Sequence, residues 1–177
     1  MKITHSDIPG NILIDISAFR DGRGSFEVFW EDDLLRNSGV LFRPESAYHS
    51  YNLKRNTVRA FHYQTMPHGQ TKLVSCVAGR IWDVAVDLRE HSPTFLRWAA
   101  VELEAGSGRS HLIPAGCAHG FATLEDDSTV AYLVEGAYQP SAARVLRWND
   151  ATLNVLWPMS HPILSDKDRA APFWRLP

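Results

Sequence analysis

The stretch KLVSCVAGRIWDVAVDLR, residues 72–89, decides the fold class of this chain. Apolar and β-branched residues flank a break at Ala78-Gly79, which predicts two strands joined by a short turn. In the second half, apolar residues alternate with a set that includes Asp83 and Asp87, and a repeat of two residues is the period of a strand. The stretch therefore predicts a pair of consecutive strands.

The flanking sequence extends this pattern in both directions. STVAYLVEGAY, residues 128–138, places Val130, Tyr132 and Val134 on one face of a strand, and RVLRWND (144–150) and NVLWP (154–158) predict further short strands. EDDLLRNSG (31–39) and SDKDRAA (165–171) are the best candidates for helices. Many strands, few helices and no regular strand–helix alternation predict an all-β sandwich or small barrel.

Composition restricts the class of protein further. The 177 residues, 45% of them hydrophobic, suit one domain over residues 1–177, and a net charge of −2 gives no basic surface for nucleic acid. Cys76 and Cys117 are too few for a disulfide framework. No apolar run is long enough to cross a bilayer, and MKITHSDIPG lacks the core of a signal peptide. We therefore expect a cytoplasmic protein with no membrane or nucleic-acid partner.

One motif makes the fold more specific. GRSHLIPAGCAHGFAT, residues 108–123, reads G-x5-P-x-G-x2-H-x3-T, which resembles the second signature of the cupin jelly-roll barrel, with Thr123 in place of the usual Asn. Pro114 and Gly116 would form a turn. The resemblance implies a cupin barrel with a few short helices, in which His119 follows that turn on a strand at the barrel mouth.

The first cupin signature is altered in a way that bears on cofactors. His62 is retained, whereas Gln64 replaces the second histidine and Lys72 stands where the signature has a glutamate. A divalent metal prefers neutral imidazoles and a carboxylate, and an ammonium group would repel it. We therefore expect no bound metal. A metal-dependent dioxygenase or isomerase is the alternative that this set of residues disfavours.

The chain also resembles the dTDP-4-dehydrorhamnose 3,5-epimerases and their relatives that act on other nucleotide-linked 4-keto sugars. The most specific pieces are VRAFHYQ, KLVSCVAGRIWDVAVDLREHSPTF, IPAGCAHGF, VEGAYQP, and WND followed by WP, and the likeness extends from about DGRGSF to LSDKDRAAP. It implies a cupin barrel, usually a homodimer, that binds a nucleotide-diphosphate-linked 4-keto sugar and works without metal or redox cofactor.

The chemistry of a 4-keto sugar gives the catalytic candidates their roles. The ketone weakly acidifies the C–H bonds at C3 and C5, so epimerisation needs a base, a cation at the enolate oxygen and an acid on the opposite face. His62 suits the base and Lys72 the enolate, and the resemblance assigns Tyr132 as the acid. By the family pattern Asp168 orients His62; helix capping with Ser165 is the alternative for Asp168.

The resemblance further implies a substrate-binding set: Arg23, Arg59, His119, Tyr138, Phe19, Phe26 and Gln64. Several of these have plainer interpretations. Strand alternation places Arg59 opposite the face of Val58, Ala60, His62 and Gln64, where it would be a surface charge, and Phe19 and Phe26 could belong to the core. His68 and His111 are expected at the surface or in turns, and Cys117 as a small apolar filler.

Several features leave the substrate open. The family commonly has a glutamate that recognises thymine where this chain has Val28, with Glu27 one residue early, so another nucleobase is a fair alternative. Inversion at C3, at C5 or at both is compatible with these residues. A cupin 3,4-ketoisomerase of nucleotide sugars and a non-catalytic sugar-binding cupin are alternatives, but the full set of His62, Lys72, Tyr132 and Asp168 favours an epimerase.

Overall fold

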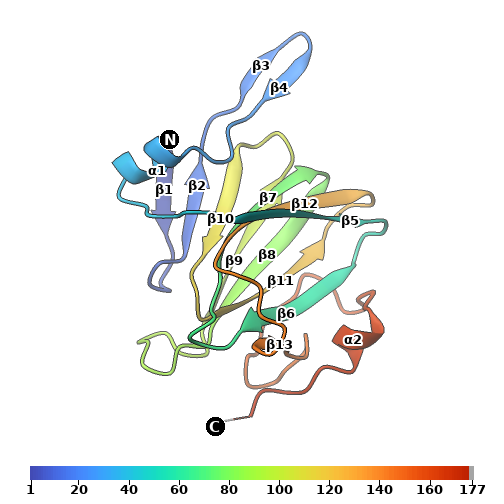
Figure 1. Cartoon of the computed structure of the whole chain (residues 1–177). Helices are drawn as coiled ribbons and strands as arrows, with labels where there is room; N and C mark the ends of the chain where they lie inside the picture. Colours follow the sequence, from blue (N-terminus) through green and yellow to red (C-terminus); the bar gives the residue numbers. More distant parts are fainter. Residues whose placement is uncertain (176–177) are drawn as a thin grey trace.

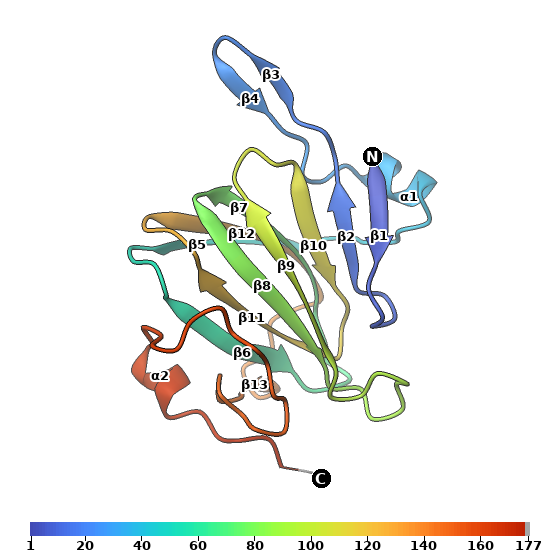
Figure 2. The same ribbon diagram turned by 180° about the vertical axis from the view of Figure 1, so that it is seen from behind.

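Two antiparallel sheets face each other in the computed structural model, which describes residues 1–175 (Figure 1). The larger sheet has the order β1 (Lys2–His5), β2 (Ile12–Asp15), β10 (Arg109–Ile113), β7 (Thr71–Ala78), β12 (Ser128–Glu135) and β5 (Ser46–Asn52). The smaller sheet has the order β13 (Ala143–Val145), β6 (Val58–Gln64), β11 (Cys117–Thr123), β8 (Arg80–Asp87) and β9 (Trp98–Glu104). Successive strands such as β7 and β8 lie in different sheets, so the predicted cupin jelly-roll barrel is confirmed (Figure 2).

Three elements stand outside the two sheets. A separate hairpin of β3 (Phe19–Asp21) and β4 (Gly24–Phe26) projects from the barrel, and α1 (Asp32–Asn37) lies near the N-terminal strands (Figure 1). The second helix, α2 (Asp166–Arg169), lies near β6, at the opposite end of the molecule from the hairpin. Both helices fall inside their predicted ranges.

Three apolar clusters hold the barrel together. The interior is filled from both sheets by side chains such as Val74, Ile81, Phe121 and Val130. The outer face of the larger sheet packs against the chain around α1, and the outer face of the smaller sheet packs against the segment after β13. Covering both outer faces explains why strands such as β8 are buried along nearly their whole length.

Backbone pairing beside β6 fixes the position of α2. The amide of Ile163 donates to the carbonyl of Asn56 at 2.8 Å, and the amide of Val58 donates to the carbonyl of Ile163 at 2.9 Å. Ser165 then caps the helix by accepting from the amide of Asp168 at 3.1 Å. As a result, a residue near the C-terminus lies next to the strand that carries His62.

Two strand predictions need correction. RVLRWND contributes a strand only at its start, as part of β13, and NVLWP forms no strand. Val155 and Trp157 are instead partly buried against the outer face of the smaller sheet, and the Trp157 indole donates to the carbonyl of Trp148 at 2.7 Å. The apolar residues of this segment therefore reflect packing of an irregular chain on a sheet rather than pairing within one.

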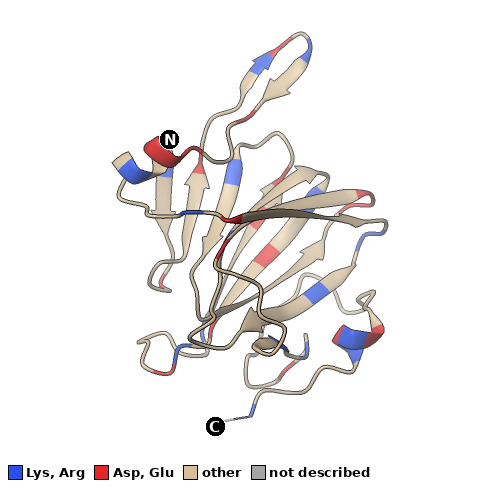
Figure 3. Cartoon of the chain, in the orientation of Figure 1, with Lys and Arg blue, Asp and Glu red and all other residues tan. Residues whose placement is uncertain are grey.

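Charges of both signs are scattered over the elements, as Figure 3 shows. Within residues 1–175, no helix has the length and hydropathy required to cross a membrane.

Candidate functional site

A pocket of about 370 Å³ lies between the two sheets beside α2. It is lined by Ser50, Arg59, His62, Lys72, His119, Phe121, Tyr132, Ser165, Lys167 and Asp168. Six of the predicted site residues thus meet in one cavity: His62, Lys72, Tyr132, Asp168, His119 and Arg59. These residues come from both sheets and from a segment near the C-terminus, which is why only the folded chain brings them together.

An irregularity in β6 explains why Arg59 shares the pocket with His62. His119 of β11 pairs with His62, and Phe121 pairs with Arg59. A step of three residues along β6 therefore matches a step of two residues along β11. The extra residue reverses the alternation between these two positions. Ala60 consequently packs in the outer apolar cluster and Arg59 faces the pocket, so the predicted alternation through this segment is wrong. The Arg59 side chain is oriented by donating to Asn52 Oδ1 at 2.8 Å.

His62 and Asp168 form a close pair at the pocket wall. His62 Nε2 lies 2.9 Å from Asp168 Oδ1, with side-chain exposures of 38% and 5% respectively. The contact does not have hydrogen-bond alignment, and Asp168 Oδ1 has no other hydrogen-bond partner in the described residues. Because only the backbone amide of Asp168 is used by the Ser165 cap, its carboxylate remains directed at His62.

Lys72 supplies a cation beside this pair. Its Nζ lies 3.5 Å from the carbonyl oxygen of His62. Burial lowers the pKa of Lys72 to about 8, and the negative charge of Asp83 partly opposes that shift. The amine is therefore predominantly charged at pH 7 and close to its own titration.

Tyr132 reaches the same cavity from the larger sheet. Its hydroxyl is 3.0 Å from Ser50 Oγ on the neighbouring strand β5. Burial raises the pKa of Tyr132, and the Ser50 hydrogen bond opposes this only in part. The phenol therefore stays protonated, as a proton donor must.

Asp83 is the buried anion behind the pocket, and sequence analysis did not single it out as a site residue. Its Oδ1 is 2.7 Å from His119 Nε2 and its Oδ2 is 2.7 Å from His111 Nδ1. Burial alone would raise the pKa of Asp83, but the charge of His119 and the hydrogen bonds from the two rings lower it to about 2. The available signal was that Asp83 lies between Ile81 and Ala85 on one face of a predicted strand, so a carboxylate follows and precedes an apolar side chain there.

The expectation that His111 lies at the surface or in a turn is wrong. His111 is 1% exposed and lies within β10, whereas His68 is exposed as predicted. Cys117 is buried as expected, and burial raises the pKa of its thiol to about 12.

The charges of the pocket suit an anionic ligand. Arg59, Lys72 and Lys167 line it, while the carboxylate of Asp83 is engaged with two imidazoles and that of Asp168 faces His62. Lys167 was also missed, since a short polar helix offers no sequence signal for a pocket. Among residues 1–175, no group of three or more His, Cys, Asp or Glu side chains is arranged to hold a metal ion.

Tyr138 borders a second hollow that adjoins the pocket. This hollow, of about 340 Å³, shares Lys72 and Tyr132 with the pocket and is also lined by Tyr48, Gln70, Val134 and Tyr138. Tyr48 pairs with Tyr132 across β5 and β12, so both project from the same face of the larger sheet. Tyr48 and Tyr138 are more than half exposed and offer two aromatic surfaces beside the catalytic candidates.

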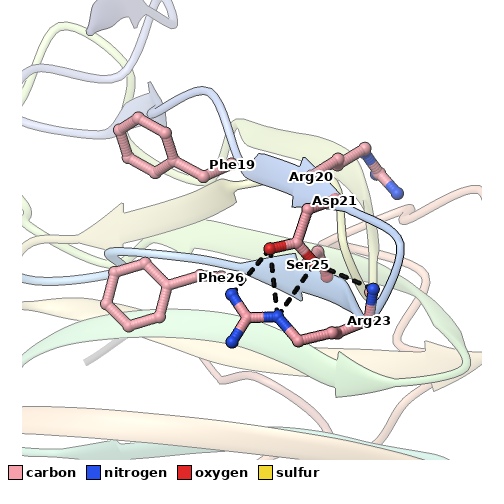
Figure 4. A pocket seen from close by; sticks show the side chains of 7 residues that line it. Phe19, Arg20, Asp21, Arg23, Ser25 and Phe26 are labelled. Carbon is pink, nitrogen blue, oxygen red and sulfur yellow. Dashed lines mark hydrogen bonds and ion pairs between the residues drawn. The ribbon is translucent and has the colours of Figure 1, made fainter.

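Three predicted substrate-binding residues lie elsewhere in the chain. Phe19, Arg23 and Phe26 are on the projecting β3–β4 hairpin, where the two phenylalanines form a cross-strand pair and Arg23 pairs with Asp21 at 2.6 Å (Figure 4). Phe19 and Phe26 are 69% and 68% exposed, so the alternative of a core role is wrong. Within one chain, the hairpin does not reach the pocket.

Gln64 and Glu27 serve the framework in this structure. The Gln64 amide donates to the carbonyls of His68 (2.6 Å) and Ala137 and accepts from the amide of Gln139, so it lies outside the pocket. Glu27 accepts from the amide of Gly108 at 3.2 Å and thereby ties the root of the hairpin to the barrel.

Comparisons with known proteins agree with this geometry. A model of the dTDP-4-dehydrorhamnose 3,5-epimerase family matches residues 5–175. The enzyme of that name from Shigella flexneri is 37% identical over 171 residues, which cover 95% of this chain and 93% of that protein. The crystal structure of dTDP-4-dehydrorhamnose 3,5-epimerase from Bacillus anthracis with TDP and PPi bound has a TM-score of 0.93 and 38% identity, covering 98% of this chain and 99% of that one.

A further similar structure has a different specificity. It is a 3'-monoepimerase from Streptomyces bikiniensis in complex with dTDP-quinovose, with a TM-score of 0.87 and 32% identity, covering 95% of this chain and 85% of that one. Sequence and fold agree over nearly the whole length in all of these comparisons. The chain therefore belongs to the dTDP-4-dehydrorhamnose 3,5-epimerase family of isomerases.

Proposed function

We propose that this enzyme inverts C3, C5 or both in a thymidine-diphosphate-linked 4-keto sugar. One observation carries the proposal: a candidate base, His62, and a candidate acid, Tyr132, line one pocket from different sheets. Inversion requires removal of a proton on one face of the sugar and its return on the other. A ring held between the two sheets would present one face to each residue.

In the proposed reaction, His62 removes the proton from the carbon next to the ketone. Asp168, buried behind the ring, stabilises the imidazolium that forms. His62 is 38% exposed in its side chain, so its proton can exchange with water before it is returned. Removal of a proton without inversion would therefore still introduce solvent hydrogen.

Lys72 stabilises the enolate in this scheme, and Tyr132 delivers the new proton. A charged ammonium in a partly buried site is a preorganised partner for the developing oxyanion. The raised pKa of Tyr132 keeps the donor protonated until the strongly basic enolate carbon forms. Proton removal and proton return thus fall to different residues.

The remaining positive charge suits the diphosphate. Arg59 is anchored by Asn52 and has a planar fork that matches phosphate oxygens, and Lys167 adds a second cation from α2. The hollow beside Tyr48 and Tyr138 offers aromatic surfaces for the nucleobase. We further propose that the enzyme is a homodimer in which the exposed phenylalanines and Arg23 of one hairpin contact the nucleotide in the partner's pocket.

Deuterium incorporation in D₂O, followed by NMR, tests the proposed function. A panel of 4-keto sugars carrying TDP, GDP and CDP is incubated with the enzyme, and the label at each carbon is measured. We expect label and inversion with the TDP substrate, at C3, C5 or both. Label appearing only with another nucleotide would overturn the thymidine assignment. No label with any substrate, from folded protein, would overturn the epimerase assignment.

A further inference from the structure

A buried series of hydrogen-bonded side chains, His111, Asp83 and His119, crosses the barrel behind the pocket. His111 lies on β10 of the larger sheet, between Leu13 of β2 and Val74 of β7. Its Nδ1 is 2.7 Å from Asp83 on β8 of the smaller sheet, and the other oxygen of Asp83 is 2.7 Å from His119 on β11. His111 does not line the pocket, whereas His119 does.

Asn11 sets the tautomer of His111. The Asn11 Oδ1 accepts from the hydroxyl of Ser6 at 2.8 Å, and its Nδ2 donates to the carbonyl of Leu112 at 3.2 Å. These two bonds fix the orientation of the amide, so Nδ2 also donates to His111 Nε2 at 2.7 Å. His111 Nε2 must then carry a lone pair, and the ring is neutral with its proton on Nδ1, directed at Asp83.

This arrangement determines the charge of the groups nearer the substrate. A neutral donor at one oxygen stabilises the Asp83 carboxylate without neutralising it, and the other oxygen accepts from His119 Nε2. Burial lowers the pKa of His119, with Lys72 adding to the effect and Asp83 opposing it. His119 is therefore neutral at pH 7, with a lone pair on Nδ1, and Lys72 carries the positive charge.

We propose that His111 is a positioning residue for the epimerisation: its Nδ1–H bond holds Asp83 ionised and keeps His119 a neutral hydrogen-bond acceptor beside Lys72. The expected effect on kcat rests on the proposed function, whereas the expected protonation states of His111 and His119 apply to the free protein. The titratable and charged groups that act on Asp83 and His119 come from several strands: Lys72 of β7, Asp83 of β8, His111 of β10 and His119 of β11. Asp83 in turn acts on Cys76, together with Glu125, and on Tyr132, together with Arg59.

The direction of the effect follows from the hydrogen bond. Without the His111 donor, Asp83 becomes a stronger acceptor, and the Asp83–His119 pair holds a second proton more tightly. His119 would then become an imidazolium at higher pH, and its charge would favour loss of the proton from Lys72. A change of one pKa unit corresponds to a tenfold change in population.

The test combines ring ¹⁵N NMR titrations with kinetics for the wild type, His111→Leu and His111→Asn. In His111→Leu we expect the pKa of His119 to rise by about one unit and kcat to fall about tenfold on the acid side of that titration, with KM little changed. An Asn side chain places an N–H close to the position of His Nδ1. His111→Asn should therefore restore both the pKa and kcat, whatever its effect on thermal stability.

The wild-type spectrum alone can overturn the proposal, even if His111→Leu does not fold. His111 should appear as the neutral Nδ1–H tautomer at pH 7, and an Nε2–H tautomer or an imidazolium would contradict the assignment. An unchanged His119 titration in folded His111→Leu would also overturn it. Because these spectra need no substrate, failure of the epimerase assay would leave the protonation result standing as a separate outcome.

Discussion

His62 on β6 and Tyr132 on β12 face the same pocket from opposite sheets of the barrel. A base must be free to accept a proton and an acid must hold one, and the surroundings of the two side chains differ accordingly. His62 is partly exposed beside Asp168, whereas Tyr132 is buried, with a raised pKa and Ser50 at its hydroxyl. This separation makes proton removal and proton return individually testable.

Tyr132→Phe should uncouple exchange from inversion. The variant keeps the ring and its packing but loses the proton on the far side of the sugar. We expect deuterium incorporation to persist through His62, while inversion falls by about a hundred- to ten-thousand-fold. NMR of the sugar in D₂O measures both quantities in one sample. Product of normal stereochemistry formed at the wild-type rate would rule out this role.

His62→Ala should remove exchange itself. No other ring of the described pocket shares both the position of His62 and its buried carboxylate partner, so we expect incorporation to fall by at least about a hundredfold. His68→Ala, at an exposed histidine outside the pocket, is the matched control and should behave as wild type. Equal incorporation by the His62 variant and the wild type would refute the assignment of the base.

Two variants of α2 separate the two roles considered for Asp168. Asp168→Asn leaves its backbone amide on the Ser165 cap but removes the charge facing His62, so kcat should fall at least tenfold with little change in unfolding free energy. Ser165→Ala removes the cap and should lower the unfolding free energy by about 1 kcal/mol. Since Ser165 also borders the pocket, its kinetics serve only as a comparison. The reverse pattern for Asp168→Asn, lost stability with normal kcat, would favour a capping role.

Whether a feature of the fold or of the site could be predicted from the sequence depends on how far apart in the chain the interacting residues lie. Local alternation predicted β7, β8 and β12, and the Pro114–Gly116 turn predicted the start of the strand on which His119 lies. The family resemblance grouped His62, Lys72 and Tyr132, and these three residues line one pocket because each lies at a fixed place on a strand of the barrel. These predictions needed no knowledge of distant contacts.

The failures arose where one extra residue or one distant partner decides the outcome. Arg59 faces the pocket only because β6 accommodates an additional residue against β11, which simple alternation cannot anticipate. His111 is buried because it meets Asp83 of the opposite sheet, 28 positions away in the chain. The hairpin with Phe19 and Phe26 lies away from the pocket of its own chain, a fact that depends on the assembled fold.

Lys72 should give the enzyme a basic limit in its pH profile. Its pKa is lowered to about 8, so the ammonium is lost and kcat/KM should fall as the pH rises through about 8. Because the pKa of Lys72 in the folded protein lies below its ordinary value of 10.5, burial of the charged amine costs stability below pH 8, and this cost decreases between pH 8 and 10.5. Titration of Lys72 therefore cannot cause unfolding over that range.

Lys72→Arg provides the comparison for this limit. A guanidinium stays charged throughout, so any activity that remains should no longer decline near pH 8. Parallel measurement of the melting temperature distinguishes loss of the charge from loss of the fold. An unchanged decline in the Arg variant would assign the limit to another group.

Mixing two inactive variants tests whether the hairpin acts on a partner. We expect Phe26→Ser to lose substrate affinity in its homodimer, because the exposed ring would no longer reach the nucleotide in the second pocket. His62→Ala retains a normal hairpin but lacks the base. After exchange of subunits, half of the dimers are mixed, and each has one pocket with both His62 and an intact hairpin. About one quarter of all pockets should therefore regain activity. No recovery, when mass spectrometry shows that mixed dimers have formed, would mean that the hairpin does not serve the partner's site.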